Sequence, residues 1–90
     1  MKTIVWTEYL KYRTKLRGFN IQKLENILRY SSEKYFDTAT DRSIVVGKHE
    51  KVLVMIPYEE SKIDITPVTV HATSRQQINY RIKSGRLINE

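Results

Sequence analysis

The sequence predicts a single α+β domain spanning residues 1–90, with the element order β-α-α-β-β-β-α. Two observations predict this class. Apolar residues recur at helical spacing through most of the first third of the chain, and β-branched and aromatic runs separated by polar turns follow as far as residue 70. A chain of 90 residues suits one hydrophobic core. We therefore expect an antiparallel sheet packed by two N-terminal helices, with a further helix at the C-terminal end.

The first third of the chain predicts a short strand and two helices. The run "TIVW", residues 3–6, is β-branched and aromatic and indicates the strand. Helical spacing begins at Glu8 and ends at Gly18, and Asn20 then suits a helix N-cap. The apolar residues that follow, at i, i+3, i+6 and i+7, indicate a helix that covers a sheet face: Ile21, Leu24, Ile27 and Leu28.

The middle of the chain predicts strands. Residues 35–40, "YFDTAT", are one candidate, and residues 43–58 contain two apolar runs around a charged connector that suits a hairpin and makes His49 a turn residue. Residues 62–70 alternate between apolar and polar, but the alternation slips by one position at Pro67. We expect a β-bulge there, which redirects the residues that follow.

The last helix has two overlapping start signals. Thr73 with Gln76, and Ser74 with Gln77, each match the capping-box pattern of a hydroxyl residue followed three positions later by Glu or Gln. Gly85 marks the end of this helix, because glycine is the usual residue just past a helix C-terminus. We therefore expect a helix from about residue 74 to residue 84.

The net charge of +6 is unevenly distributed along the chain. Residues 1–30 contain seven Lys and Arg against two Asp and Glu, and residues 71–90 contain four against one, whereas residues 31–60 contain four against six. Cations from the two ends can meet on one face if those segments pack together, and a basic face attracts phosphates. With a sequence pI near 9.7, the chain is a candidate for nucleic-acid binding.

Several classes of function are disfavoured by the composition. The chain has no cysteine, which excludes disulfides and thiolate metal sites, and neither of its two histidines has a carboxylate at a ligand spacing. We expect no metal ion and no cofactor. No apolar run approaches the roughly 18 residues of a membrane span, so we expect a cytoplasmic protein without membrane contact. Gly-rich phosphate loops, serine nucleophile elbows and paired-carboxylate motifs are absent.

The candidate catalytic chemistry lies at the junction between the last strand and the last helix. A ribonuclease that uses no metal ion needs a base for the 2′-hydroxyl, an acid for the leaving oxygen and cations near the phosphate. His71 can act as acid or base near neutral pH, and Arg75 offers a planar fork for two phosphate oxygens. At 100° per residue, Tyr80 lies about 140° around the helix from Arg75, so we expect Tyr80 to be structural. The alternative is that these residues have no catalytic role, with His71 an ordinary residue at a strand end and Arg75 a solvated charge on the helix.

Further cations and the tyrosines are candidates for contacts with RNA. Basic residues on the first helix, around the hairpin and on the last helix can bind the phosphate backbone, or can simply be solvated. These residues are Arg13, Lys15, Arg17, Lys48, Lys51 and Arg81. Six tyrosines offer stacking surfaces for bases, but in a domain of this size we expect most of them to pack in the core.

Short motifs recur in a fixed order from Trp6 to Tyr80. A tryptophan precedes the first helix, "RGFN" separates the two helices, Arg42 stands five residues ahead of Gly47, and the strand "KVLVMIPYEE" follows. An Ala-Thr pair then opens the last helix, with a basic residue two positions on, a capping residue three on and a tyrosine seven on: Ala72, Thr73, Arg75, Gln76 and Tyr80. In this order the motifs resemble those of the BrnT-type toxins, a branch of the RelE-like superfamily of bacterial toxin–antitoxin systems.

The resemblance implies a RelE-like fold and a metal-independent endoribonuclease that cuts messenger RNA, free or on the ribosome, and stops growth. It implies a cognate antitoxin protein as partner, and operator DNA contacted only through that antitoxin. The implied catalytic residues are His71 as acid or base, with Arg75 and Arg42 holding the phosphate.

Two positions favour an alternative hypothesis. The chain has Val70 and Gln77 where the family commonly has arginine. This difference favours a module on the same fold that binds RNA, the ribosome or a partner protein without cleavage. A purely structural subunit is a third hypothesis, and it predicts no RNA binding at low salt.

Overall fold

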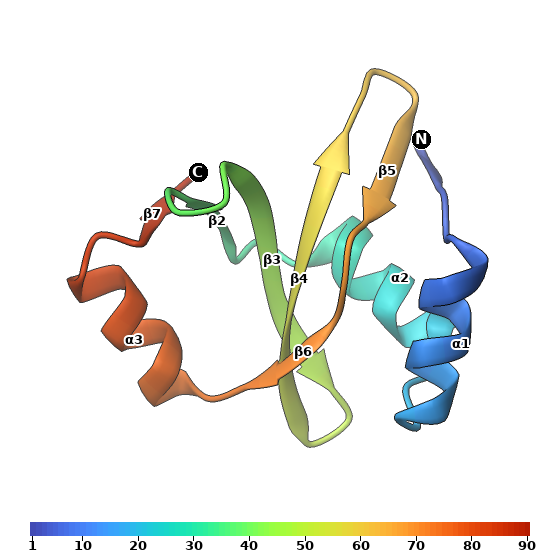
Figure 1. Ribbon diagram of the computed structural model, residues 1–90, viewed down its shortest axis with the longest axis horizontal. Helices are drawn as coiled ribbons and strands as arrows, with labels where there is room; N and C mark the ends of the chain where they lie inside the picture. Colours follow the sequence, from blue (N-terminus) through green and yellow to red (C-terminus); the bar gives the residue numbers. More distant parts are fainter.

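A long antiparallel hairpin formed by β3 (Arg42–His49) and β4 (Val52–Glu60) is the centre of the fold (Figure 1). The structure is a computed structural model that describes residues 1–90. The other elements are, in chain order, β1 (Thr3–Ile4), α1 (Glu8–Leu16), α2 (Ile21–Tyr30), β2 (Lys34–Asp37), β5 (Asp64–Pro67), β6 (His71–Thr73), α3 (Arg75–Lys83) and β7 (Leu87–Asn89). One seven-stranded sheet has the order β1-β5-β4-β3-β2-β7, and β6 pairs with β4.

The fold class is α+β with three helices, as predicted, but the sheet is mixed and not purely antiparallel. β1 runs parallel to β5, whereas the other strand pairs are antiparallel. A parallel pair needs a long connection, and here α1, α2 and three strands separate β1 from β5. The observed order has five strands between α2 and α3 where the predicted order has three, and a further strand, β7, follows α3.

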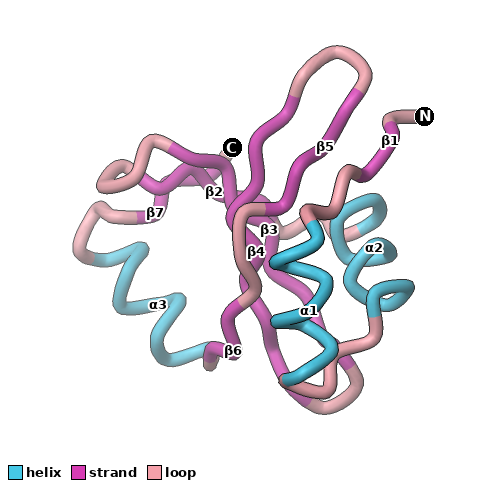
Figure 2. Tube along the Cα trace, turned by 45° about the vertical axis from the view of Figure 1, so that its right-hand side comes forward, coloured by secondary structure: helices cyan, strands magenta, loops and turns pink.

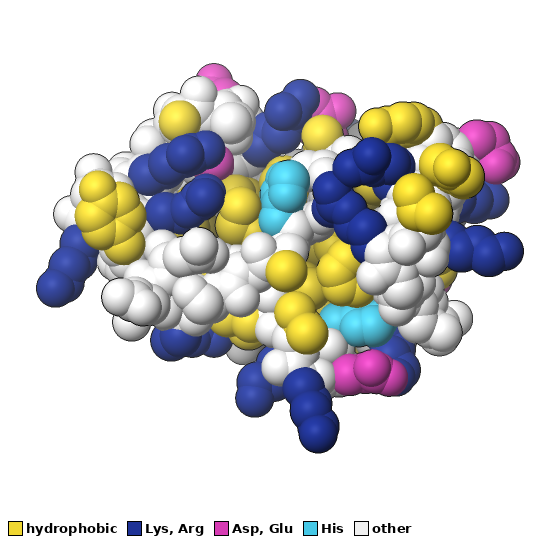
Figure 3. Space-filling model, turned by 60° about the horizontal axis from the view of Figure 1, so that its bottom comes forward, with side chains coloured by type: hydrophobic (Ala, Val, Ile, Leu, Met, Phe, Trp, Pro, Cys, Tyr) yellow, Lys and Arg dark blue, Asp and Glu magenta, His cyan; other side chains and the backbone are white.

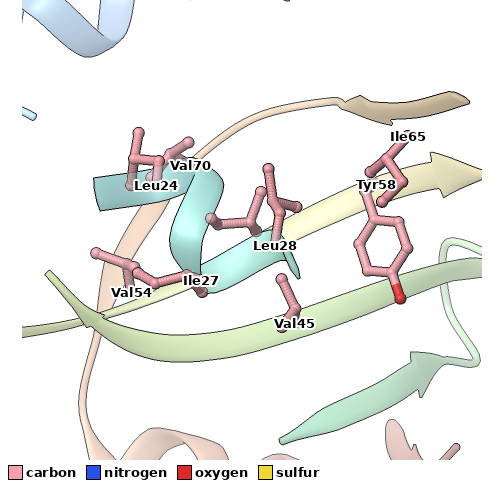
Figure 4. Close-up of a cluster of buried hydrophobic side chains, with 9 residues drawn as sticks. Leu24, Ile27, Leu28, Val45, Val54, Tyr58, Ile65 and Val70 are labelled. Atoms are coloured by element: carbon pink, nitrogen blue, oxygen red, sulfur yellow. The ribbon is translucent and has the colours of Figure 1, made fainter. Parts of the chain in front are cut away.

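One face of the central hairpin is covered by α2 and α1. Alternate residues of a strand point to opposite sides of the sheet, and Val45 and Val54 point towards α2. There they form a cluster of nine buried residues together with Leu24, Ile27 and Leu28 of that helix (Figure 4). The apolar stripe predicted for this helix is therefore the side that covers the sheet.

The opposite face of the hairpin is covered by α3 and β7. Ile44, Val46 and Met55 form a second buried cluster there with Ile78 of α3 and Leu87 of β7. Figures 1 and 2 show α3 on one side of the strands and α1 with α2 on the other. Burial of both faces explains why the apolar runs of the hairpin are continuous rather than alternating.

Side-chain caps begin the helices at the predicted places. The Asn20 side chain accepts a hydrogen bond from the Lys23 backbone N–H at 3.0 Å. Ser74 accepts one from the Gln77 N–H at 3.2 Å, so Ser74 is the cap of α3, whereas Thr73 belongs to β6. With nine or ten residues each, none of the helices has the length and apolar character that a membrane span requires.

A one-residue bulge separates β5 from β6. Both strands pair with β4, with Pro67 opposite Tyr58 and His71 opposite Met55. Three residues, 68–70, therefore face only two residues of β4. This is the slip that the sequence predicted at Pro67. It matters for function because it sets the position of His71, the first residue after the bulge.

Replacing Gly47 with alanine is expected to destabilise the protein by about 1–3 kcal/mol, because the new methyl group overpacks the contact between β3 and α2. A Cβ atom at this position lies 2.8 Å from Cγ2 and 3.0 Å from Cγ1 of Ile27, a buried side chain with little freedom to move. Urea unfolding measures the effect. Gly47→Ala combined with Ile27→Ala should cost less than the sum of the two single changes, and simple additivity would contradict this packing account.

The last strand is tied to the sheet by an ion pair. Asp37, at the end of β2, is buried and accepts hydrogen bonds from Arg86 Nε at 3.2 Å and Arg86 Nη2 at 3.3 Å, just before β7. Burial of the Asp37 carboxylate opposes its ionisation, but Arg86 and the N–H groups of Ala39 and Thr40 outweigh burial, so the pKa of Asp37 lies below its ordinary value.

This ion pair predicts a loss of stability in acid. Because the folded state lowers the pKa of Asp37, the stabilisation is complete above the unfolded-state pKa of about 4 and disappears as the pH falls through the folded-state pKa. Asp37→Asn is expected to lower the free energy of unfolding by about 1.5–3 kcal/mol at pH 7 and to flatten its decline below pH 4. Unfolding measured between pH 2 and pH 7 tests this, and an unchanged acid limb in the variant contradicts it.

Candidate functional site

His71 lies at the start of β6, on the underside of the molecule between α1 and α3. Its neighbour Val70 is buried in the core, whereas the His71 side chain is exposed. The pKa of His71 is lowered, first because partial burial disfavours the charged imidazolium, and then because Arg17 and Arg81 repel a third positive charge. A lowered pKa favours the neutral imidazole, which is the form that accepts a proton.

Arg17 reaches His71 from the end of α1. Gly18, with a φ of +80°, adopts the left-handed conformation that ends a helix, so the chain turns away after Arg17. The Arg17 Nη1 atom donates a hydrogen bond to the Val70 carbonyl at 2.8 Å, one residue before His71. This is the only acceptor of the guanidinium within the chain, so most of its five N–H donors remain free to bind an anion.

Arg81 reaches the same place from α3, on the other side of the hairpin. Ile78, one turn earlier, is buried and anchors α3 against the sheet. Arg81 is half-buried, forms no side-chain hydrogen bond or ion pair, and contributes to the lowered pKa of His71. In Figure 3, the upper of the two histidine side chains on this face has Lys and Arg side chains on both sides. Arg17 from the first third of the chain and Arg81 from its last part thus both act on His71.

Ion pairing divides the cations of the chain into two groups. Six Lys and Arg side chains pair with carboxylates: Lys2, Lys11, Lys23, Arg42, Arg75 and Arg86. None of the six cations that the sequence assigned to RNA contacts is in this group. They therefore keep their full charge for an external anion, whereas a paired cation gives up part of its attraction to a neighbouring carboxylate.

Arg75 belongs to the paired group. Its two terminal nitrogens face both carboxylate oxygens of Glu33, with Nη2 3.1 Å from Oε1. The Tyr35 hydroxyl donates to the same carboxylate at 2.8 Å. Hydrogen bonding from Arg75 is the main cause of the lowered pKa of Glu33. The Arg75 guanidinium, which was expected to hold a phosphate, therefore binds a carboxylate. The charges that act on His71 come from Arg17 and Arg81, and not from Arg75.

Arg42 lies at the other end of the hairpin from His71. Its Nε atom is 3.6 Å from Oε2 of Glu59, which is four residues along β4 from Met55, the partner of His71. At about 3.3 Å per residue, the two positions are about 13 Å apart along the strand. The structure therefore does not bring Arg42 together with His71, as the expected catalytic set required.

The other predicted RNA contacts do not all lie on one surface. Arg13 and Arg17 line one surface hollow, and Arg17 and Lys51 line a second, so these residues are continuous with the position of His71. Lys48 lines a separate hollow that also contains Tyr30. Lys15 is exposed on α1 and lines none of these three hollows.

His49 is a buried structural residue and not the turn residue that was predicted. It ends β3 with only 5% of its surface exposed, and its Nε2 atom accepts the backbone N–H of Asn20 at 2.9 Å. The ring packs edge-on against Phe19, with ring centroids 5.1 Å apart. His49 thus fixes the α1–α2 connection to the hairpin, which leaves His71 as the histidine available for chemistry.

Most of the tyrosines are on the surface, contrary to expectation. Tyr35 and Tyr58 are buried, but Tyr9, Tyr12, Tyr30 and Tyr80 are 64–72% exposed. Tyr80 was predicted to be structural because it lies far around α3 from Arg75. That phase is correct, but the face it identifies points to solvent and not to the core. The chain therefore presents aromatic rings beside free cations, a combination that suits unpaired bases.

The site combines an imidazole with two cations, of which Arg17 is held in place by its hydrogen bond to the Val70 carbonyl. A neutral imidazole flanked by two guanidinium groups can take a proton from a hydroxyl while the guanidinium groups hold phosphate oxygens. A bound phosphate would offset the repulsion from Arg17 and Arg81 and raise the pKa of His71. Comparisons with protein-family models, with curated proteins and with solved structures find no match.

Proposed function

We propose that this protein is a toxin-like endoribonuclease that binds RNA at His71, Arg17 and Arg81 and cleaves it without a metal ion. The observation that carries the proposal is the exposed His71 side chain at the start of β6, next to the residue whose carbonyl holds Arg17 and within the charge influence of Arg81, two arginines that have no carboxylate partner. The net charge of +6 and the exposed tyrosines support RNA as the ligand, since phosphates and unpaired bases complement these two features.

The proposed reaction is an internal phosphoryl transfer. His71 takes the proton of the ribose 2′-hydroxyl, and the 2′-oxygen attacks the adjacent phosphorus. Arg17 and Arg81 stabilise the negative charge that develops on the phosphate oxygens. The bond to the 5′-oxygen breaks, that oxygen takes a proton from water, and the products are a 2′,3′-cyclic phosphate and a 5′-hydroxyl end.

The toxin part of the proposal draws on the order of motifs along the chain. We infer from this order that the domain has a RelE-like fold and that messenger RNA is its substrate. A cognate antitoxin protein then blocks the basic surface until the toxin is released. An acidic antitoxin suits this surface, because a complementary charge speeds association and selects the partner.

A second candidate function is RNA binding without cleavage. The ion pairs of Arg75 and Arg42 favour it, because neither side chain offers a free guanidinium to a phosphate near His71. The role of His49 also favours it, since this ring is held in the core and supplies no second acid or base. In this case RNA binds with the salt dependence of a phosphate-binding protein but stays intact.

Inducible expression in a bacterial host tests the proposal. The wild-type chain is expected to arrest growth and to fragment cellular RNA, and the fragments should carry cyclic phosphate ends. Growth arrest with intact RNA would support the binding module instead. Normal growth, intact RNA and no RNA binding by the purified protein at low salt would remove both functions.

A further inference from the structure

A narrow groove runs along α1 to the candidate site. It has a volume of about 140 Å³ and lies between α1 and residues 68–70, the segment that joins β5 to β6. Figure 2 shows this segment beside α1. Arg17 forms the end of the groove next to His71, because its guanidinium is bonded to the Val70 carbonyl. The groove and the candidate site therefore share one residue.

Three side chains of α1 face this groove in a row. Tyr9, Arg13 and Arg17 are four residues apart in sequence, so they lie one above another on the same side of the helix. With a rise of 1.5 Å per residue, successive members are about 6 Å apart. Tyr9 is 70% exposed, so its ring is accessible at the end of the row far from His71.

The chemistry of the groove suits an anionic ligand. Arg13 and Arg17 have no carboxylate partner, and no acidic side chain lines the groove. The opposite wall contains Thr69 and Val70, whose backbone N–H groups donate no hydrogen bond within the chain. The groove thus contains cations and hydrogen-bond donors but no competing carboxylate.

We propose that this groove is a nucleotide subsite that positions single-stranded RNA for the reaction at His71. Arg13 binds the phosphate next to the one held by Arg17 and Arg81, and the base of the neighbouring nucleotide stacks on Tyr9. The subsite requires an unpaired strand, because a base in a duplex cannot leave its stack to reach the Tyr9 ring. This inference rests on the proposed RNA binding at His71 and adds to it a length requirement and two positioning residues.

The affinity of short RNAs tests the subsite. Dinucleotides and tetranucleotides carrying 2′-O-methyl groups cannot be cleaved, and their binding to the full chain can be followed by fluorescence anisotropy. The wild-type protein is expected to bind the tetranucleotide about tenfold or more tightly than the dinucleotide. Tyr9→Leu and Arg13→Gln should remove most of this gain and leave dinucleotide binding unchanged. Arg13→Gln should also reduce the slope of log K against log salt concentration for the tetranucleotide by about 0.7.

Matched controls lie on the same helix. Tyr12 and Lys11 are also exposed on α1 but do not line the groove, so Tyr12→Leu and Lys11→Gln should keep the full difference in affinity between tetranucleotide and dinucleotide. The subsite alone would be overturned if the control variants lost as much tetranucleotide affinity as Tyr9→Leu and Arg13→Gln. It would also be overturned if those two variants still bound the tetranucleotide about tenfold more tightly than the dinucleotide. No binding of either oligonucleotide by the wild-type chain would overturn the proposed function and the subsite together. If polyglutamate, and not RNA, depended on Tyr9 and Arg13, the groove would be a protein-docking surface and the inference would be wrong.

Discussion

Replacing His71 with glutamine is expected to slow RNA cleavage by a factor of about 10²–10⁴, the usual contribution of a general base. Glutamine keeps a polar side chain on the exposed end of β6, so the fold and the RNA affinity should change little. The wild-type rate should rise with pH as His71 in the RNA complex loses its proton and becomes able to act as a base. The variant should lose this limb of the profile.

The measurement is the single-turnover rate on a labelled RNA between pH 5 and pH 8. Lys62→Gln, a change on the β4–β5 connection, is a suitable control for handling and stability. A His71→Gln variant that cleaves at the wild-type rate would exclude His71 as the base. A wild-type chain that binds RNA but cleaves none of it would favour the binding module.

The double substitution Arg17→Gln and Arg81→Gln is expected to weaken RNA binding by about 100-fold in low salt. Each arginine replaces counterions on the RNA, so the slope of log K against log salt should fall by about 0.7 per residue. The effect should be large because both side chains lack a carboxylate partner in the free protein and lose no ion pair on binding.

The control for this prediction carries the same change of net charge. Lys34 and Lys62 form no ion pair, and Lys34 lies on β2, three strands from β6 in the sheet. Lys34→Gln with Lys62→Gln should retain most of the affinity. Equal losses in the two double variants would show that RNA responds only to the overall charge of the chain, and the site at His71 would then have no support.

Local signals in the sequence predicted much of the fold. The stripe of α2 and its Asn20 cap are short-range features, and both agree with the structure. The slip at Pro67 predicted the bulge because β-strand alternation is also a local property. The strand β7 was missed, because three residues have no periodicity of their own and this strand depends on pairing with β2 and on Arg86 binding Asp37.

The candidate site was predicted in part. His71 was identified because its residue type and its place after a strand are visible in the sequence. Its partners were not, since Arg17 approaches through a hydrogen bond to a carbonyl 53 residues away, and Arg75 is bound by a carboxylate 42 residues away. Helical phase placed Tyr80 opposite Arg75, but phase alone does not tell which side of a helix faces solvent.

Nuclear magnetic resonance of His71 tests the central claim most directly. The pKa of His71 can be followed in the free chain and with an uncleavable tetranucleotide. A site that holds a phosphate between His71, Arg17 and Arg81 predicts a lowered pKa of His71 in the free protein and a rise when RNA binds. A His71 pKa that stays the same in saturating RNA would contradict this account.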